Sequence, residues 1–182
     1  MKYPKQIEPK LKELKVDPTE YVIVVSVADQ KMTLFRGEES IITYTVSTSE
    51  RGTGQIENTM QTPLGLHRVA EKIGESAAVG AIFKAREDTG QTCPPGAAGR
   101  RDEDLILTRI LRLEGLEEGL NRGHDRDGRI IDSFKRYIYI HGTNHEEQLG
   151  TPASHGCVRM GNLDVIDLFN RIPEGTLVWI TS

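Results

Sequence analysis

Residues 21–47 read YVIVVSVADQKMTLFRGEESIITYTVS, which is three β-branched runs separated by two short polar turns. Apolar runs of this length, bounded by Gly, Asp and Glu, are typical of strands joined in hairpins. Similar runs follow along the chain: LHRVAEKI (66–73), AIFKA (81–85), LILTRILRL (105–113), RYIYIHG (136–142) and TLVWI (176–180). The sequence therefore predicts a mainly β fold with one or two short helices.

Two segments, 7–15 and 162–170, instead carry apolar residues at helical spacing. Each predicts a short amphipathic helix, the first covering one end of the domain and the second following the region that carries the chemistry. We divide the chain into an N-terminal helical extension, residues 1–20, and a domain over residues 21–182.

Two further segments, 86–104 and 119–133, lack periodicity and are rich in Gly, Pro and charge. Loops of this length in a compact domain are usually functional lids or disordered. We expect both segments to be loops, and the sequence does not predict how they move.

The composition excludes several classes of function. The 182 residues include 23 basic and 27 acidic side chains mixed along the chain, so no basic face for nucleic acid is expected. The longest aliphatic run, 22–25, is far shorter than a membrane span, and residues 1–20 interleave charges with prolines, unlike a secretory signal. Two cysteines are too few for a disulfide framework. We expect a cytoplasmic protein without cofactor or membrane insertion; its oligomeric state is not predicted.

The chemistry is concentrated in residues 137–160, YIYIHGTNHEEQLGTPASHGCVRM. A strand delivers His141 at its end, where Gly142 is expected to let the chain turn sharply. Cys157 follows Gly156, whose small size would let a substrate carbonyl approach the backbone. A thiol with an ordinary pKa near ~8.5 needs a base to supply thiolate, and His141 is our prediction for that base.

Neighbouring groups complete the predicted site. The Gly142 carbonyl or the Thr143 hydroxyl could hold the second imidazole nitrogen of the base, and main-chain amides of Gly156 and Cys157 could stabilise an oxyanion. Arg159 would place a guanidinium on the rim, able to pair with a substrate carboxylate. His155, Ser154 and Tyr139 are further substrate-binding predictions, of which Tyr139 is first of all a strand residue.

Three motifs together resemble the L,D-transpeptidase catalytic domain family (YkuD-type). They are the stretch SHGCVR at 154–159, HGT at 141–143 and TPLG at 62–65, and the resemblance extends over residues 21–180. It implies a β-sandwich-like fold in which Cys157 is the nucleophile and His141 the base. The implied reaction is attack on the bond between a diaminoacid and D-alanine in a peptidoglycan stem tetrapeptide, through an acyl-enzyme.

The resemblance leaves the acceptor of the acyl group open. Water would make the chain an L,D-carboxypeptidase of peptidoglycan recycling, and the expected cytoplasmic location favours this. The amine of another stem or a free D-amino acid would make it an L,D-transpeptidase. A non-catalytic wall-binding module is a further alternative, which the intact cysteine and histidine disfavour.

Two metal sites are alternatives to the thiol. His141, His145, His155 and Cys157 are possible zinc ligands and would define a zinc-dependent hydrolase, but the first two histidines span a turn instead of one helical face. The acidic segment 125–132 lacks the further ligands and closing Glu of a calcium loop. We therefore predict no metal, and take Cys93, in a Pro-rich loop, as incidental.

Overall fold

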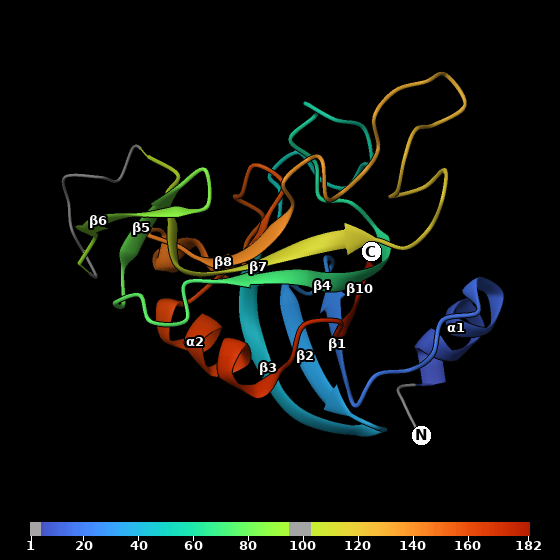
Figure 1. The fold of residues 1–182 in the computed structure, drawn as a ribbon, viewed down its shortest axis with the longest axis horizontal. Coiled ribbons are helices and arrows are strands. Elements are labelled where there is room, and N and C mark those ends of the chain that lie inside the picture. The colour runs from blue at the N-terminus through green and yellow to red at the C-terminus, as the bar shows by residue number, and fades with distance from the viewer. Residues whose placement is uncertain (1–4, 95–102) are drawn as a thin grey trace.

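The computed structural model describes residues 5–94 and 103–182 (Figure 1). As predicted, strands dominate these ranges. The helical elements are the 3-10 turns Lys5–Ile7 and Glu146–Gln148 and the helices α1 (Glu8–Leu14) and α2 (Asn162–Arg171). The strands are β1 (Tyr21–Ser26), β2 (Lys31–Arg36), β3 (Glu39–Ser47), β4 (Gly65–Ile73), β5 (Ala81–Lys84), β6 (Glu87–Thr92), β7 (Ile106–Gly115), β8 (Tyr139–Gly142), β9 (Val158–Met160) and β10 (Leu177–Thr181).

All of these strands belong to one sheet, in the order β4-β10-β1-β2-β3-β9-β8-β7-β5-β6. Because β4 also pairs with β7, the sheet closes on itself, and the β5–β6 hairpin projects from β7 (Figure 1). Alternate residues of each strand point inward, so one face of the sheet encloses the core. That core is lined by Ile23, Val25, Leu34, Val46, Val69, Leu111, Leu113, Ile140, Val158 and Val178, and α2 adds Val165, Leu168 and Phe169.

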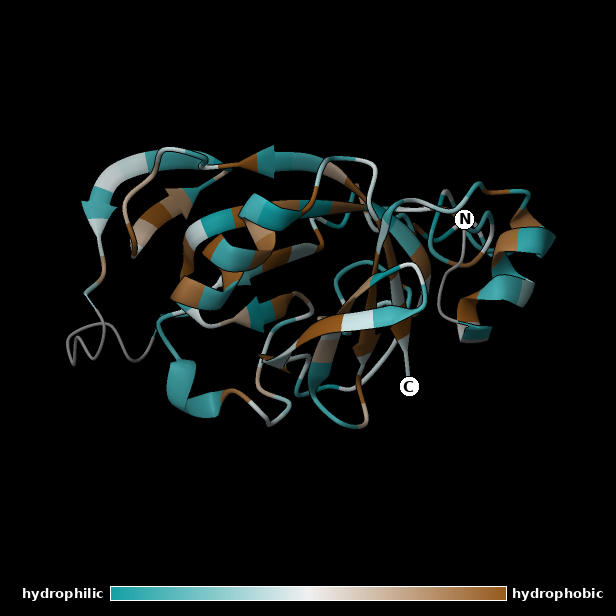
Figure 2. Ribbon diagram, turned by 90° about the horizontal axis from the view of Figure 1, so that it is seen from below, coloured by the Kyte–Doolittle hydropathy of each residue, from teal (hydrophilic) through white to brown (hydrophobic). Residues whose placement is uncertain are grey.

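Helix α1 forms where the N-terminal periodicity predicts it and covers the outer face of the sheet. Ile7 and Leu11 are buried against Val22, Leu66 and Leu177, which lie on three neighbouring strands. Burying an aliphatic side chain of this size stabilises by about 2 kcal/mol, so the helix is held by packing rather than by its length of seven residues. Figure 2 shows hydrophobic residues of α1, in brown, interleaved with hydrophilic ones, in teal.

The sequence missed two strands. The prediction of a loop over 86–104 is wrong at β6, whose six residues are all exposed and pair with β5 only. An edge strand exposed on both faces needs no alternation of apolar residues, so periodicity gave no signal for it. Strand β9 is three residues long, too short for a pattern, yet it joins β3 to β8. Residues 95–102 lie outside the described part of the predicted loop.

The segment 119–133 has no named strand, as predicted, but it is held by specific hydrogen bonds. The Asn121 side chain, fully buried, accepts from Glu117 N–H and donates to the carbonyls of Leu64 and Leu66. Asp132 accepts from the N–H of Gly123, which closes the other end of the loop. The loop is therefore an ordered wall beside β4 and β7.

His67, on β4, makes the stability of the fold depend on pH. Its ring is fully buried, with Nδ1 3.0 Å from the Gly65 carbonyl and Nε2 3.0 Å from the Ser133 hydroxyl. Burial lowers the pKa of His67 from 6.5 to about 4. Below pH 6.5 the imidazole of residue 67 is protonated in the unfolded chain, whereas in the folded chain it stays neutral down to about pH 4. The free energy of unfolding therefore falls as pH decreases from 6.5 to about 4.

We expect this loss to reach about 3 kcal/mol at pH 4. Urea unfolding at pH 7 and pH 4.5, compared between the wild type and His67→Gln, measures it, since the difference between the two proteins removes the contribution of other titrating groups. An equal decrease in both proteins would contradict the prediction.

No helix within residues 5–94 and 103–182 is long and apolar enough to span a membrane.

Candidate active site

The register of β8 and β9 brings His141 and Cys157 to the same side of the sheet. The two strands are parallel, with Ile140 beside Val158 and His141 beside Arg159. Ile140 and Val158 point into the core, so the residues on either side of them point outward. Cys157 then lies beside Tyr139, whose backbone N–H donates to its sulfur over 3.3 Å. Cys157 and His141 are therefore offset by two residues in the direction of the strands, which corresponds to about 6.6 Å between their backbone positions.

The tautomer of His141 is set by the strand end itself. Its Nδ1 lies 2.7 Å from the Gly142 carbonyl, which can only accept, so Nδ1 carries the proton and donates. Nε2 is left with a free lone pair, the state that a general base requires. Thr143, the other predicted partner, instead accepts from the His145 N–H through its hydroxyl.

The prediction that Gly142 allows a sharp turn is wrong. Gly142 is the last residue of β8 and is absent from the glycines with positive φ. Close packing explains the glycine at this position, because a Cβ there would lie 2.5 Å from the side-chain oxygen of Asn162 and 2.8 Å from the Leu107 carbonyl. The buried Asn162 donates in turn to the Thr143 carbonyl, which anchors the start of α2 behind the histidine.

Cys157 and His141 are uncharged at neutral pH. Burial raises the pKa of Cys157 to about 11, against the lowering effects of the Tyr139 N–H and the guanidinium groups of Arg159 and Arg136. Burial also lowers the pKa of His141 below its ordinary value. A preformed thiolate–imidazolium pair therefore does not fit this site, because desolvation opposes both charges. If Cys157 is the nucleophile, its proton would have to leave during attack, when the developing C–S bond disperses the charge.

This arrangement predicts slow alkylation of the resting enzyme. At pH 7 a thiol with a pKa of about 11 is ionised to roughly one part in ten thousand, so iodoacetamide should label Cys157 more slowly than a free thiol. The rate should increase about tenfold per pH unit up to the pKa. Mass spectrometry of peptides containing Cys157 or Cys93 follows each site separately. A labelling rate that levels off below pH 8 would indicate a thiolate–imidazolium pair instead.

The turn that presents the cysteine is held from beneath by hydroxyl groups. Gly156 has φ +123°, a conformation that favours glycine, and its carbonyl accepts from the Thr62 hydroxyl over 3.0 Å. Thr62, from the TPLG motif, also accepts from the Ser49 N–H and is fully buried. A long-range contact therefore links the two sequence motifs.

Ser154 does not face a substrate. It is 1% exposed, donates to the Cys157 carbonyl over 2.6 Å and accepts from the Gly156 N–H over 3.2 Å. These bonds brace the turn, which corrects the prediction that Ser154 binds substrate. They also occupy the Gly156 amide, which the sequence suggested as an oxyanion donor.

Arg159 lies behind the surface instead of on an exposed rim. Its side chain is 3% exposed, and Nη2 lies 2.6 Å from Asp104, while Nη1 donates to Gln148 over 3.3 Å. The same Asp104 oxygen is 3.1 Å from Nδ1 of the exposed His155. Asp104 thus ties together both residues that the sequence placed around the nucleophile.

Sequence reasoning missed Asp104 and Arg136. Asp104 lies at the end of the segment predicted as a loop, and nothing local distinguishes it from other exposed acids. Arg136 donates to the carbonyls of Gly54, Gln55 and Gln61, which fixes the loop beside Gly156. Both act through contacts distant in sequence, so no motif records them.

Tyr139 is buried with Cys157 packed against it, and its hydroxyl accepts from Arg86 over 3.4 Å. The substrate-binding role proposed for its hydroxyl stays a prediction.

Among the described residues, no group of three or more His, Cys, Asp or Glu side chains is placed to hold a metal ion, so the structure does not support the zinc alternative. His145 is instead turned toward the Glu103 carbonyl, 3.1 Å from Nε2. In the acidic segment, Asp125 accepts from the backbone N–H of Asp127 and Arg129 and pairs with the Arg129 side chain.

Two hollows flank His155. One, of about 270 Å³, lies beside Tyr137, whose carbonyl contacts the cysteine sulfur. The charged residues that line it are Lys135, Arg136 and Glu57, and His155 lines it as well. The other, of about 410 Å³, is lined by Glu50, Asp104, His155 and Arg159. The hollows on the two sides of His155 therefore differ in charge.

Comparison with known proteins agrees with this fold. The family model for the YkuD L,D-transpeptidase catalytic domain matches residues 20–180, and the chain belongs to that family. Within it, the putative L,D-transpeptidase YqjB of Bacillus subtilis is 51% identical over 56 residues, 31% of this chain and 28% of that protein. The putative L,D-transpeptidase YkuD of the same organism is 48% identical over 46 residues, 25% of this chain and 28% of that protein. These matches span less than a third of the length of either curated relative.

Solved structures show the same fold at low identity. An L,D-transpeptidase from Mycobacterium smegmatis aligns with TM-score 0.53 and 11% identity, over 90% of this chain and 59% of that one. L,D-transpeptidase 3 from Mycobacterium tuberculosis, in complex with a faropenem-derived adduct, aligns with TM-score 0.52 and 14% identity, over 90% and 60%. The fold class predicted from the sequence is thereby confirmed.

Proposed function

We propose that this chain cleaves the bond between the L-centre of a diaminoacid and the terminal D-alanine of a peptidoglycan stem tetrapeptide. Cys157 Sγ bonds to the carbonyl carbon while Nε2 of His141 takes the thiol proton. The C–N bond then breaks, His141 returns the proton to the leaving amine, and D-alanine departs from a thioester. The observation that carries this proposal is the outward-facing pair of a thiol and an imidazole whose Nδ1 is already committed to the Gly142 carbonyl.

The charge around the thiol supports an anionic substrate. Lys135 and Arg136 line the hollow beside Tyr137, and stem peptides carry several carboxylates. Arg136 is already fixed by three carbonyls, so it offers a preorganised positive field near the sulfur.

We propose water as the acceptor, which makes the reaction an L,D-carboxypeptidation. A second stem would bring an ammonium group, which the basic hollow repels, whereas water needs no binding site of its own. We further propose that the enzyme works in the cytoplasm on wall fragments, because a reducing compartment keeps the thiols of Cys157 and Cys93 free.

One observation favours the alternative of transpeptidation. The hollow on the other side of His155 is lined by Glu50, whose carboxylate would attract the ammonium group of an acceptor, and by the ion pair of Asp104 with Arg159. Amine transfer to another stem or exchange with a free D-amino acid would proceed through that approach.

Mass spectrometry of tetrapeptide incubated with the enzyme separates these functions. The proposal predicts tripeptide and D-alanine in equal amounts, whether or not free D-methionine is present. Exchange product without net tripeptide would establish the transferase instead. Faropenem provides an independent probe of the nucleophile: a stable mass increase on the wild type, absent from Cys157→Ala, supports acylation of this thiol. No tripeptide, exchange or adduct would overturn the function altogether.

A further inference from the structure

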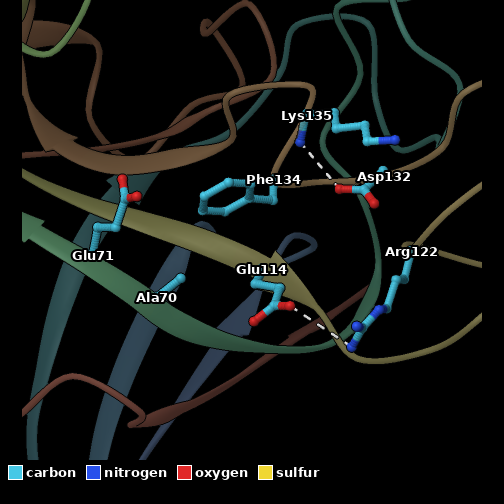
Figure 3. A pocket seen from close by; sticks show the side chains of 7 residues that line it. All are labelled: Ala70, Glu71, Glu114, Arg122, Asp132, Phe134 and Lys135. Carbon is cyan, nitrogen blue, oxygen red and sulfur yellow. Dashed lines mark hydrogen bonds and ion pairs between the residues drawn. The ribbon is translucent and has the colours of Figure 1, made fainter.

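A third hollow, of about 310 Å³, lies on the outer face of β4 and β7, outside the site described above. Figure 3 shows its lining, in which one aromatic ring is surrounded by acidic and basic groups. The hollow is lined by Ala70, Glu71, Glu114, Arg122, Asp132, Phe134 and Lys135.

The Phe134 ring is a fixed platform within this hollow. The guanidinium of Arg112 lies 3.4 Å from the centre of the ring, and Arg112 also donates to the Phe134 carbonyl over 2.9 Å and to Glu71 over 3.1 Å. Asp132 accepts from the Lys135 N–H, which closes the turn that carries the ring. An aromatic ring held in place loses little entropy when a ligand stacks on it.

The hollow continues from the active site. Lys135 lines both this hollow and the basic one beside the thiol. The register also forms one row across four strands: Cys157 lies beside Tyr139, Tyr139 pairs with Arg112, and Arg112 pairs with Glu71. Neighbouring strands are about 4.8 Å apart, so Glu71, three strands away along this row, lies roughly 14 Å from Cys157.

That separation matches the reach of the proposed substrate. The three residues that precede the scissile bond span about 10 Å when extended, and the stem is joined by a lactyl group to a sugar. A stem bound with its D-alanine end at Cys157 and its other end over Tyr137 would bring the sugar to Phe134. A pyranose presents apolar C–H faces edged by hydroxyl groups, which suit an aromatic ring flanked by carboxylates such as Glu114 and Asp132.

We infer that the hollow between β4, β7 and the Asp132–Lys135 turn binds the sugar that carries the stem peptide. The inference rests on the proposed function, since it orients the same substrate. The enzyme then selects sugar-bearing stem peptides over free ones.

The test compares kcat/KM for the disaccharide tetrapeptide and the free tetrapeptide in the same assay. We expect the wild type to favour the sugar-bearing substrate by about tenfold, and Phe134→Leu to reduce this ratio to near one. Phe134→Tyr keeps the platform and should keep the ratio. Phe35→Leu, an aromatic change on β2 far from the hollow, is the matched control and should also keep it.

A second variant guards against a folding defect in Phe134→Leu. Ala70→Leu fills the hollow without changing the ring, and should lower the ratio in the same way, with melting temperatures checked for both. Binding of the disaccharide tripeptide to Cys157→Ala, followed by saturation-transfer NMR, should show the sugar protons in contact with the protein. Equal kcat/KM for the two substrates in the wild type, or an unchanged ratio in both Phe134→Leu and Ala70→Leu, would overturn the inference. Turnover of neither substrate would instead reject the proposed function.

Discussion

Cys157→Ala is expected to lower kcat/KM by at least about 10⁴-fold while the protein stays folded. The thiol is the only group at this position that can bond to the substrate carbonyl, so its loss removes the acyl-enzyme route. The side chain is partly buried against Tyr139 and Ile110, so a methyl group leaves only a small void. Rates of D-alanine release, with circular dichroism to verify folding, measure the effect.

Cys93→Ser is the matched control for this prediction. Cys93 is buried with Ile82 and Leu107, in a different cluster from the one against which Cys157 packs, so its replacement should leave activity nearly unchanged. Serine at position 157 would test the same point more strictly, because a hydroxyl fills the space but is a weaker nucleophile. A fatal Cys93 substitution combined with a tolerated Cys157 substitution would show that the nucleophile has been assigned to the wrong residue.

His141→Gln is expected to lower kcat/KM by about 10²- to 10⁴-fold, the usual contribution of a general base. The loss should be large here because the thiol is protonated at rest, with a pKa of about 11, so that attack depends on a base to remove its proton. Glutamine retains a polar group of similar size, so the strand end should stay intact.

The pH profile gives this prediction its sign. The base must be unprotonated, and burial places the pKa of His141 below 6.5. In the wild type kcat/KM should therefore rise with pH and level off below pH 6.5, whereas in His141→Gln it should keep rising toward pH 11 as thiolate forms directly. The exposed His124, replaced by glutamine, is the control. A wild-type profile that still rises above pH 8 would rule out His141 as the base.

The β-branched runs between residues 21 and 180 were sufficient to predict most of the strands, because a strand with one buried face must alternate or stay apolar. Strands β6 and β9 escaped because one is exposed on both faces and the other is three residues long. The SHGCVR and HGT motifs were sufficient to predict a nucleophile at residue 157 and a base at residue 141, and the structure places a positive-φ glycine before the thiol and the histidine near the end of β8.

Charge and burial were decided only by the tertiary structure. The sequence suggested a thiol with an ordinary pKa and an Arg159 on the rim, yet burial raises the pKa of Cys157 to about 11, and Asp104 pairs with the guanidinium from a segment about fifty residues away. Glu71 likewise lies in one row with Cys157 only because β4 pairs with β7 and β7 pairs with β8. Phe134 meets Glu71 in the hollow that these strands form. A pattern in the sequence determines which side chains face outward; the dielectric and the partners that they meet there depend on elements that only folding brings together.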